Sequence, residues 1–151
     1  MRDAYLIIHI LAAGAWFGTN MVQVAVNPGI NNKSPVVAAE WHRTLQRFAT
    51  RVYMPAAIIS LVTGILLIVA VDDSPYEMSD AFVSVGFLMI IIGAAMGMGF
   101  FIKKSRDAAA AYDAGDISGA AEIEKKISVA GLLDTVLIVL TVVAMVSKWG
   151  V

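Results

Sequence analysis

The 151-residue sequence contains no cysteine and few charged side chains. Without thiols, the chain can form no disulfide, no cysteine-ligated zinc site and no cysteine-ligated iron–sulfur cluster. Charged residues make up 15 % of the chain, against about 25 % in a soluble domain. Hydrophobic residues make up 59 %, and the mean hydropathy is +0.77. With a net charge of −1, the chain has no excess of basic residues of the kind typical of proteins that bind nucleic acid. Composition therefore predicts a single integral membrane domain over residues 1–151.

Long apolar segments predict the fold class. The expected transmembrane helices cover about 4–26, 52–71 with an interfacial start from residue 36, 80–102, and 129–147. Each is about long enough to cross a hydrocarbon layer of ~30 Å. We expect Asn27-Pro28-Gly29 to end the first helix and Pro55 to kink or offset the second. The pattern predicts an all-α, four-helix up-down transmembrane bundle.

Lysine and arginine are distributed unevenly between the connections. The two long connections, with the start of the second helix, carry nine basic residues: Lys33, Arg43, Arg47, Arg51, Lys103, Lys104, Arg106, Lys125 and Lys126. The opposite side has only Arg2 and Lys148, and the segment 72–77 is acidic. By the positive-inside rule, both termini are expected outside and the long connections in the cytoplasm. We expect a multi-pass protein of the cell inner (cytoplasmic) membrane.

His9 is the first candidate for chemistry, because it lies inside the first apolar segment. Neutral imidazole is a common axial ligand of haem iron, and polar groups at membrane depth are costly to keep. A hydrogen bond across the bundle that serves packing is the alternative. His42 is the only other histidine, and we expect it at the opposite interface in an interfacial or phosphate-contacting role. A sixth iron ligand would then be water, another subunit, none, or a methionine such as Met89 or Met145.

Asp134 is the one acid inside an apolar span, and Asn20 and Gln23 lie at matching depth on the first helix. A hydrogen bond from either amide to Asp134 would satisfy these groups structurally. Alternatively, the carboxyl group relays protons or coordinates an ion, and desolvation would favour its protonated form. We therefore expect an intramembrane polar site at these three residues.

Two further patterns concern contacts with lipid or with partners. Arg43, Arg47 and Arg51 recur every four residues, so they could bind lipid headgroups or cofactor carboxylates, or form a solvated face. Gly93 and Gly97 form a small-xxx-small pair that lets a neighbouring helix approach closely. That glycine face could join a homo-oligomer or a larger membrane complex within the lipid bilayer.

Two sequence stretches carry a family resemblance. HILAAGAWFG and LQRFATRVYMPAAIISLVTGILLIV resemble the first two helices of small bacterial four-helix membrane proteins. That group includes HemJ-type protoporphyrinogen oxidases, the copper-resistance D (CopD) membrane domain and their uncharacterised relatives. The resemblance implies haem b, with His9 as the axial, metal-binding ligand. It implies a cofactor-binding set of His9, Trp16, Gly18, Arg47 and Arg51, with the Trp16–Gly18 region beside the porphyrin. The HemJ-type lysine of the third helix has no counterpart before Lys103.

The leading hypothesis is a haem b-binding or redox-associated membrane protein with His9 as axial ligand. One alternative is a small transporter, or a proton- or ion-conducting module, that uses Asp134, Asn20 and Gln23. Another is an accessory or assembly protein without chemistry of its own. The residues leave open whether the protein is an enzyme.

Overall fold

The computed structural model describes residues 1–71 and 74–150, apart from the side chain of Asn31. It contains α1 (Arg2–Asn31), α2 (Pro35–Phe48), α3 (Met54–Val69), α4 (Ala81–Ala95), α5 (Ile102–Asp113) and α6 (Ile117–Ser147), with two π-helical segments. The segment η1 (Ala49–Tyr53) joins α2 to α3, and η2 (Met96–Phe101) joins α4 to α5. No strand occurs within the described ranges. The all-α prediction is confirmed.

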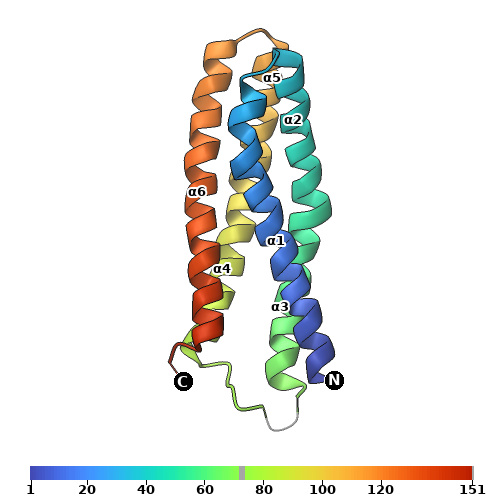
Figure 1. Cartoon of the computed structure of the whole chain (residues 1–151), viewed down its shortest axis with the longest axis vertical. Coiled ribbons are helices and arrows are strands. Elements are labelled where there is room, and N and C mark those ends of the chain that lie inside the picture. The colour runs from blue at the N-terminus through green and yellow to red at the C-terminus, as the bar shows by residue number, and fades with distance from the viewer. Residues whose placement is uncertain (72–73, 151) are drawn as a thin grey trace.

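These elements form four long helices, each apolar enough to cross a membrane: Arg2–Ile30, Pro35–Val69, Ala81–Asp113 and Ile117–Ser147. They run up and down in sequence order (Figure 1). Both termini and the connection between α3 and α4 lie at one end, which we call the terminal end. The α1–α2 and α5–α6 connections lie at the other end, the loop end. The membrane side of each end stays a prediction from charge, and Asp72 and Asp73 of the acidic segment lie outside the described residues.

The predicted end of the first helix at Asn27-Pro28-Gly29 is wrong, because α1 continues through Pro28 to Asn31. A proline so near the end removes only one backbone hydrogen bond. Two side chains stabilise this last turn: Asn32 Nδ2 donates to the Pro28 carbonyl oxygen at 2.8 Å, and Trp41 Nε1 donates to Asn27 Oδ1 at 2.6 Å. The contact with α2 therefore holds the helix together past the proline.

The expected offset at Pro55 is confirmed, because the π-helical segment η1 ends two residues before it. Pro55 has no N–H to donate to the carbonyl four residues earlier, so the hydrogen-bond ladder shifts its register there. The third long helix has a second π-helical segment, η2, and continues beyond the basic residues at 103–106 to Asp113. Alanine has the highest helix propensity, which explains why α5 continues through its alanine-rich stretch.

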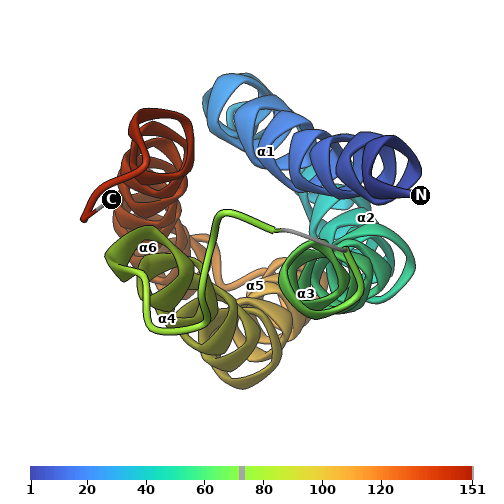
Figure 2. The same cartoon turned by 90° about the horizontal axis from the view of Figure 1, so that it is seen from below.

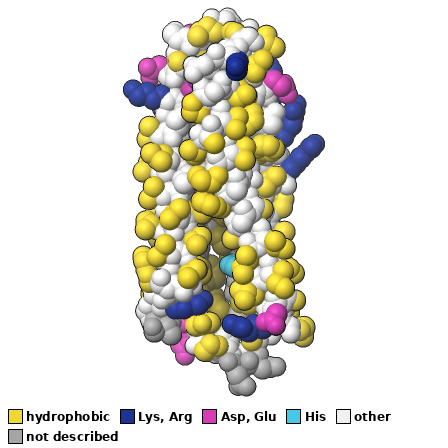
Figure 3. All heavy atoms as spheres, viewed as in Figure 1, with side chains coloured by type: hydrophobic (Ala, Val, Ile, Leu, Met, Phe, Trp, Pro, Cys, Tyr) yellow, Lys and Arg dark blue, Asp and Glu magenta, His cyan; other side chains and the backbone are white. Residues whose placement is uncertain are grey.

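Buried side chains form three apolar clusters along the bundle. The middle one contains Trp16, Ala56, Met89 and Ile138. Three alanines of α2 and α6 pack around Tyr112 of α5 near the loop end. Phe82, Val83 and Ala144 form the third cluster near the terminal end. Hydrophobic side chains also cover the outer flank, with charged groups gathered toward both ends (Figure 3). This distribution is typical of a protein that lies in lipid.

Candidate functional site

His9 is half-buried on α1, and its ring is fixed by α3. The His9 Nδ1 atom lies 3.0 Å from the Ser60 carbonyl oxygen and 3.1 Å from Thr63 Oγ1. A carbonyl oxygen can only accept, so Nδ1 must carry the hydrogen. The Thr63 hydroxyl also has an acceptor, the carbonyl oxygen of Ile59 at 2.6 Å. In the neutral imidazole, this arrangement leaves the lone pair on Nε2, the atom that can bind a metal.

His9 lines a cavity of about 350 Å³, here named the terminal cavity. This cavity lies between α1 and α3 on one side and α4 and α6 on the other. Seen from below, α1 and α3 lie on one side of the bundle and α4 and α6 on the other (Figure 2). Figure 3 shows a hollow on the molecular face, with a histidine side chain visible in it. Gly64 leaves room beside the His9 ring, because a Cβ there would lie 3.3 Å from His9 Cε1.

Two cationic side chains, Arg2 and Lys148, line the terminal cavity near the chain ends. Burial and the nearby Arg2 lower the pKa of Lys148. The Lys148 Nζ atom lies 4.7 Å from the ring centre of Tyr76 and 4.6 Å from that of Phe82. An anionic group bound here would relieve the repulsion between the two cations.

Four residues that the resemblance placed around a cofactor do not meet His9. Trp16 is buried in the middle cluster, about two helical turns from His9, and does not line the terminal cavity. Gly18 is exposed, with open space where a Cβ would be. Arg47 is exposed and lies 2.9 Å from Glu40, while Arg51 is exposed one turn further along. None of these four residues lines the cavity that contains His9, so their role in binding a cofactor stays a prediction.

Of the two methionines considered as a sixth ligand, only Met145 lines the terminal cavity. Its methyl group occupies the space beside Gly86, across the cavity from α1. Met89 is buried against Trp16 in the middle cluster. The structure thus places one thioether on the wall of the cavity that contains His9.

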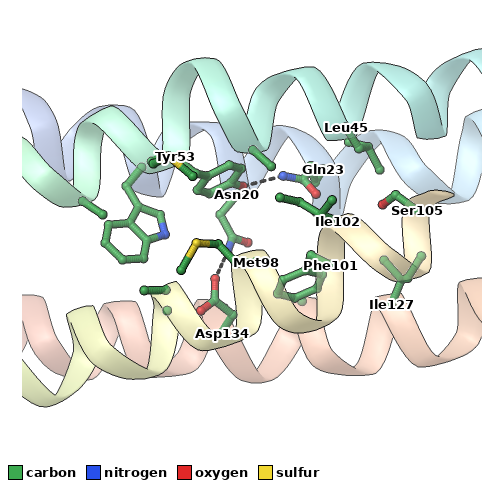
Figure 4. Close-up of a pocket in the computed structure, with 18 of the residues that line it drawn as sticks. Asn20, Gln23, Leu45, Tyr53, Met98, Phe101, Ile102, Ser105, Ile127 and Asp134 are labelled. Atoms are coloured by element: carbon green, nitrogen blue, oxygen red, sulfur yellow. Dashed lines mark hydrogen bonds between the residues drawn. The ribbon is translucent and has the colours of Figure 1, made fainter.

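A larger cavity of about 610 Å³, the central cavity, lies nearer the loop end. The predicted polar site lies on its wall (Figure 4). Asn20 Nδ2 donates to Asp134 Oδ2 at 2.5 Å, which confirms one of the two expected amide contacts. Gln23 instead donates to the hydroxyl of Tyr53. Asp134 is 4 % exposed, and its Oδ1 has no hydrogen-bond partner among the described residues.

Gly93 and Gly97 both line the central cavity, so the glycine face points into its own bundle. A Cβ at Gly93 would overlap the indole ring of Trp16. At Gly97 a Cβ would enter open space. The expectation that this face joins a second copy or a partner is therefore wrong for Gly93, whose missing side chain makes room for Trp16.

His42 is 1 % exposed and lies at the loop end, so its ring is not open to an outside phosphate group, which corrects that part of the expectation. Its Nε2 lies 3.1 Å from Glu124 Oε1, which also accepts a hydrogen bond from Tyr112 at 2.6 Å. The His42 and Tyr112 rings stack 6.1 Å apart. Nearby, Arg43 pairs with Asp113 and Glu40. These contacts join α2, α5 and α6 at the loop end.

Sequence reasoning missed Ser60, Thr63 and Tyr53 as site residues, although all three lie in the second stretch that carries the family resemblance. Ser60 acts through its backbone carbonyl, which leaves no signal in residue type. Tyr53 lies in η1 and lines the central cavity, and its position two residues before Pro55 was the available clue. No group of three His, Cys, Asp or Glu side chains that could hold a bare metal ion occurs within residues 1–71 and 74–150.

Residues 4–149 match a family described as "Predicted integral membrane protein (DUF2269)". The match covers nearly the whole chain. No curated protein and no solved structure matches the chain significantly.

Proposed function

The chain belongs to the DUF2269 family of integral membrane proteins, and we propose that it binds haem b in the terminal cavity, with His9 as axial ligand. The protein is a multi-pass membrane protein with four apolar helices. We place it in the inner membrane, with both termini outside, on the distribution of basic residues.

The proposal rests on the tautomer and the orientation of the His9 ring. Its Nδ1–H is directed at the Ser60 carbonyl, with Thr63 beside it. Metal-binding histidines are commonly held in this way, because the second-shell hydrogen bond sets the tautomer and orients the ring. Ser60 and Thr63 would therefore keep Nε2 available for iron.

The other residues of the terminal cavity also fit a haem. The walls from α3 and α4 are apolar, as a porphyrin requires, and Gly64 leaves space next to the histidine. Arg2 and Lys148 could pair with the propionate groups. Met145 lines the same cavity from α6, and its thioether could supply a second ligand to the iron.

Bound haem b would supply one-electron redox chemistry at this end of the bundle. The chain's own residues would bind and orient it and shield it from water within an apolar pocket. The Asp134 cluster, on which the transport alternative depends, lies in the other cavity.

An absorption spectrum of the purified protein, oxidised and reduced, tests the proposal. The wild type, loaded with haem, is expected to show a Soret band that His9→Ala removes. His42→Gln removes the other imidazole, which lies at the opposite end of the bundle, and should leave the band intact. Met145→Leu should shift the band without abolishing binding, because it changes only the proposed second ligand.

A wild type that stays colourless after reconstitution with haem would reject the proposal. A band that survives in His9→Ala would also reject it, since another group would then hold the iron.

A further inference from the structure

Asp134 carries an oxygen atom, Oδ1, that forms no hydrogen bond with any residue that the structure describes. It lies in a membrane-spanning helix, and no lysine, arginine or histidine of the described residues forms an ion pair with it. A carboxyl group in such a place is neutral, because an unpaired charge in hydrocarbon is costly. Asn20 donates to Oδ2, so the acidic hydrogen belongs on Oδ1. Oδ1 is buried without an acceptor within the described ranges.

Two more donors line the same cavity. Tyr53 accepts the hydrogen bond from Gln23, so its own hydroxyl hydrogen is available for another acceptor. Trp16 adds an indole N–H, a group that can only donate. The rings of Trp16 and Tyr53 meet edge to face at 6.5 Å. The cavity therefore offers hydrogen-bond donors and aromatic surface to whatever occupies it.

The central cavity can be reached from the surrounding lipid. Met54 and Ile58 of α3 and Met98 of η2 line it and are 41 %, 56 % and 57 % exposed, respectively. A molecule that enters between them would come from the hydrocarbon layer. It must therefore be largely apolar and uncharged.

Both π-helical segments border this cavity. Tyr53 belongs to η1, and Gly97, Met98 and Phe101 belong to η2. π-helical turns cost stability and occur frequently at functional sites. Here they place an aromatic hydroxyl on one wall and leave room at Gly97 on another.

We propose that the central cavity binds a neutral, lipid-soluble carbonyl compound of the quinone class, with a ring carbonyl accepting a hydrogen bond from Asp134 Oδ1. A quinone offers acceptors and no donors, which complements the unused donors of the wall. Its flat ring suits the aromatic side chains, and its apolar tail can extend into lipid. The site is separate from the proposed haem site, although Leu61 and Ile90 line both cavities.

The test is saturable binding of decyl-ubiquinone to the protein in phosphatidylcholine nanodiscs, with empty nanodiscs as the baseline for partition into lipid. Asp134→Leu removes the donor and should raise Kd about tenfold, the effect of one buried hydrogen bond. Asp134→Asn should stay within about threefold of the wild type. The asparagine oxygen can still accept from Asn20, and its NH₂ group can then donate in place of Oδ1.

Gly97→Leu should abolish saturable binding, because its side chain would enter the open space of the cavity. Thr141→Val is the matched control on α6. The Thr141 hydroxyl bonds only within its own helix, to the Leu137 carbonyl oxygen at 2.8 Å, so binding should not change. His9→Ala should also bind normally, which separates this result from the haem proposal.

Three results would overturn the inference. One is binding no greater than that of empty nanodiscs. Another is wild-type affinity in both Asp134→Leu and Gly97→Leu. The third is an equal loss in Asp134→Asn and Asp134→Leu, which would mean that a hydrogen bond donated from the position of Oδ1 does not hold the quinone.

Discussion

Gly93→Ala should destabilise the protein, because the added methyl group collides with a side chain that cannot move aside. A Cβ at Gly93 would lie 2.6 Å from Trp16 Cη2, and nearer still to Cζ2. Carbon atoms in good contact are about 3.5–4.0 Å apart. Trp16 is 8 % exposed and packs against Ala56, Met89 and Ile138, so its indole has little room to shift. We expect a loss of about 1–3 kcal/mol in the free energy of unfolding.

Gly97→Ala is the matched control, one helical turn along the same helix. Its Cβ would meet nothing within 4 Å. Replacing glycine by alanine in a helix without a clash stabilises by about 0.5–1 kcal/mol, because the unfolded chain loses conformational freedom. The two substitutions should therefore change the free energy of unfolding in opposite directions and differ by about 1.5–4 kcal/mol.

Reversible unfolding in mixed micelles, followed by far-ultraviolet circular dichroism, measures the difference. Trp16→Phe shortens the ring and should relieve the collision, so its combination with Gly93→Ala should cost less than the two separate losses together. Equal stability of Gly93→Ala and Gly97→Ala would show that the indole does not lie against Gly93. If both Gly93→Ala and Gly97→Ala destabilise the protein and also dissociate an oligomer, the two glycines lie at a contact between copies of the chain.

Three further predictions concern the ends of the bundle. Asp116→Ala should lower the free energy of unfolding by about 1 kcal/mol, because the Asp116 carboxylate caps α6 by accepting a hydrogen bond from the Gly119 N–H at 2.9 Å. Asp116→Asn keeps an acceptor and should lower it less in the same unfolding assay. Glu124→Leu should lower the free energy of unfolding by about 1–3 kcal/mol, because it leaves His42 and Tyr112 buried without their shared acceptor. An unchanged free energy would show that this contact is not formed. The lowered pKa of Lys148 predicts that stability rises as pH increases toward the ordinary lysine value of about 10.5, since the unfolded chain then holds the proton longer. Lys148→Met should flatten that rise, and an unchanged slope would assign it to another group.

Several features of the fold can be predicted from residue type and spacing alone. Apolar runs long enough to span lipid, separated by polar connections, already define the helices and their up-down order. Pro55 predicts the shift at η1, since a missing N–H is a property of the residue itself. Matching depth on two helices also predicted that Asn20 could reach Asp134. These features depend on residue type and spacing, which are visible in one dimension.

Other features depend on which side of each helix faces its neighbour, and only packing decides that. Pro28 and Gly29 read as a helix end, yet the contact between Trp41 and Asn27 holds α1 together beyond them. Arg47, Arg51 and Gly18 share motifs with His9 and Trp16, but the turns of long helices direct them outward.

Hydrophobicity and charge add along the chain, so residue order alone predicts a membrane-embedded, four-helix protein with a histidine and an acid at membrane depth. Packing in three dimensions sets which side chains these two residues meet: Arg2 and Lys148 line the cavity of His9, and Tyr53 lines that of Asp134. Which side chains meet in a cavity depends on the rotation of each helix about its own axis. The packing of side chains sets that rotation, as at Gly93, where the absence of a side chain makes room for Trp16.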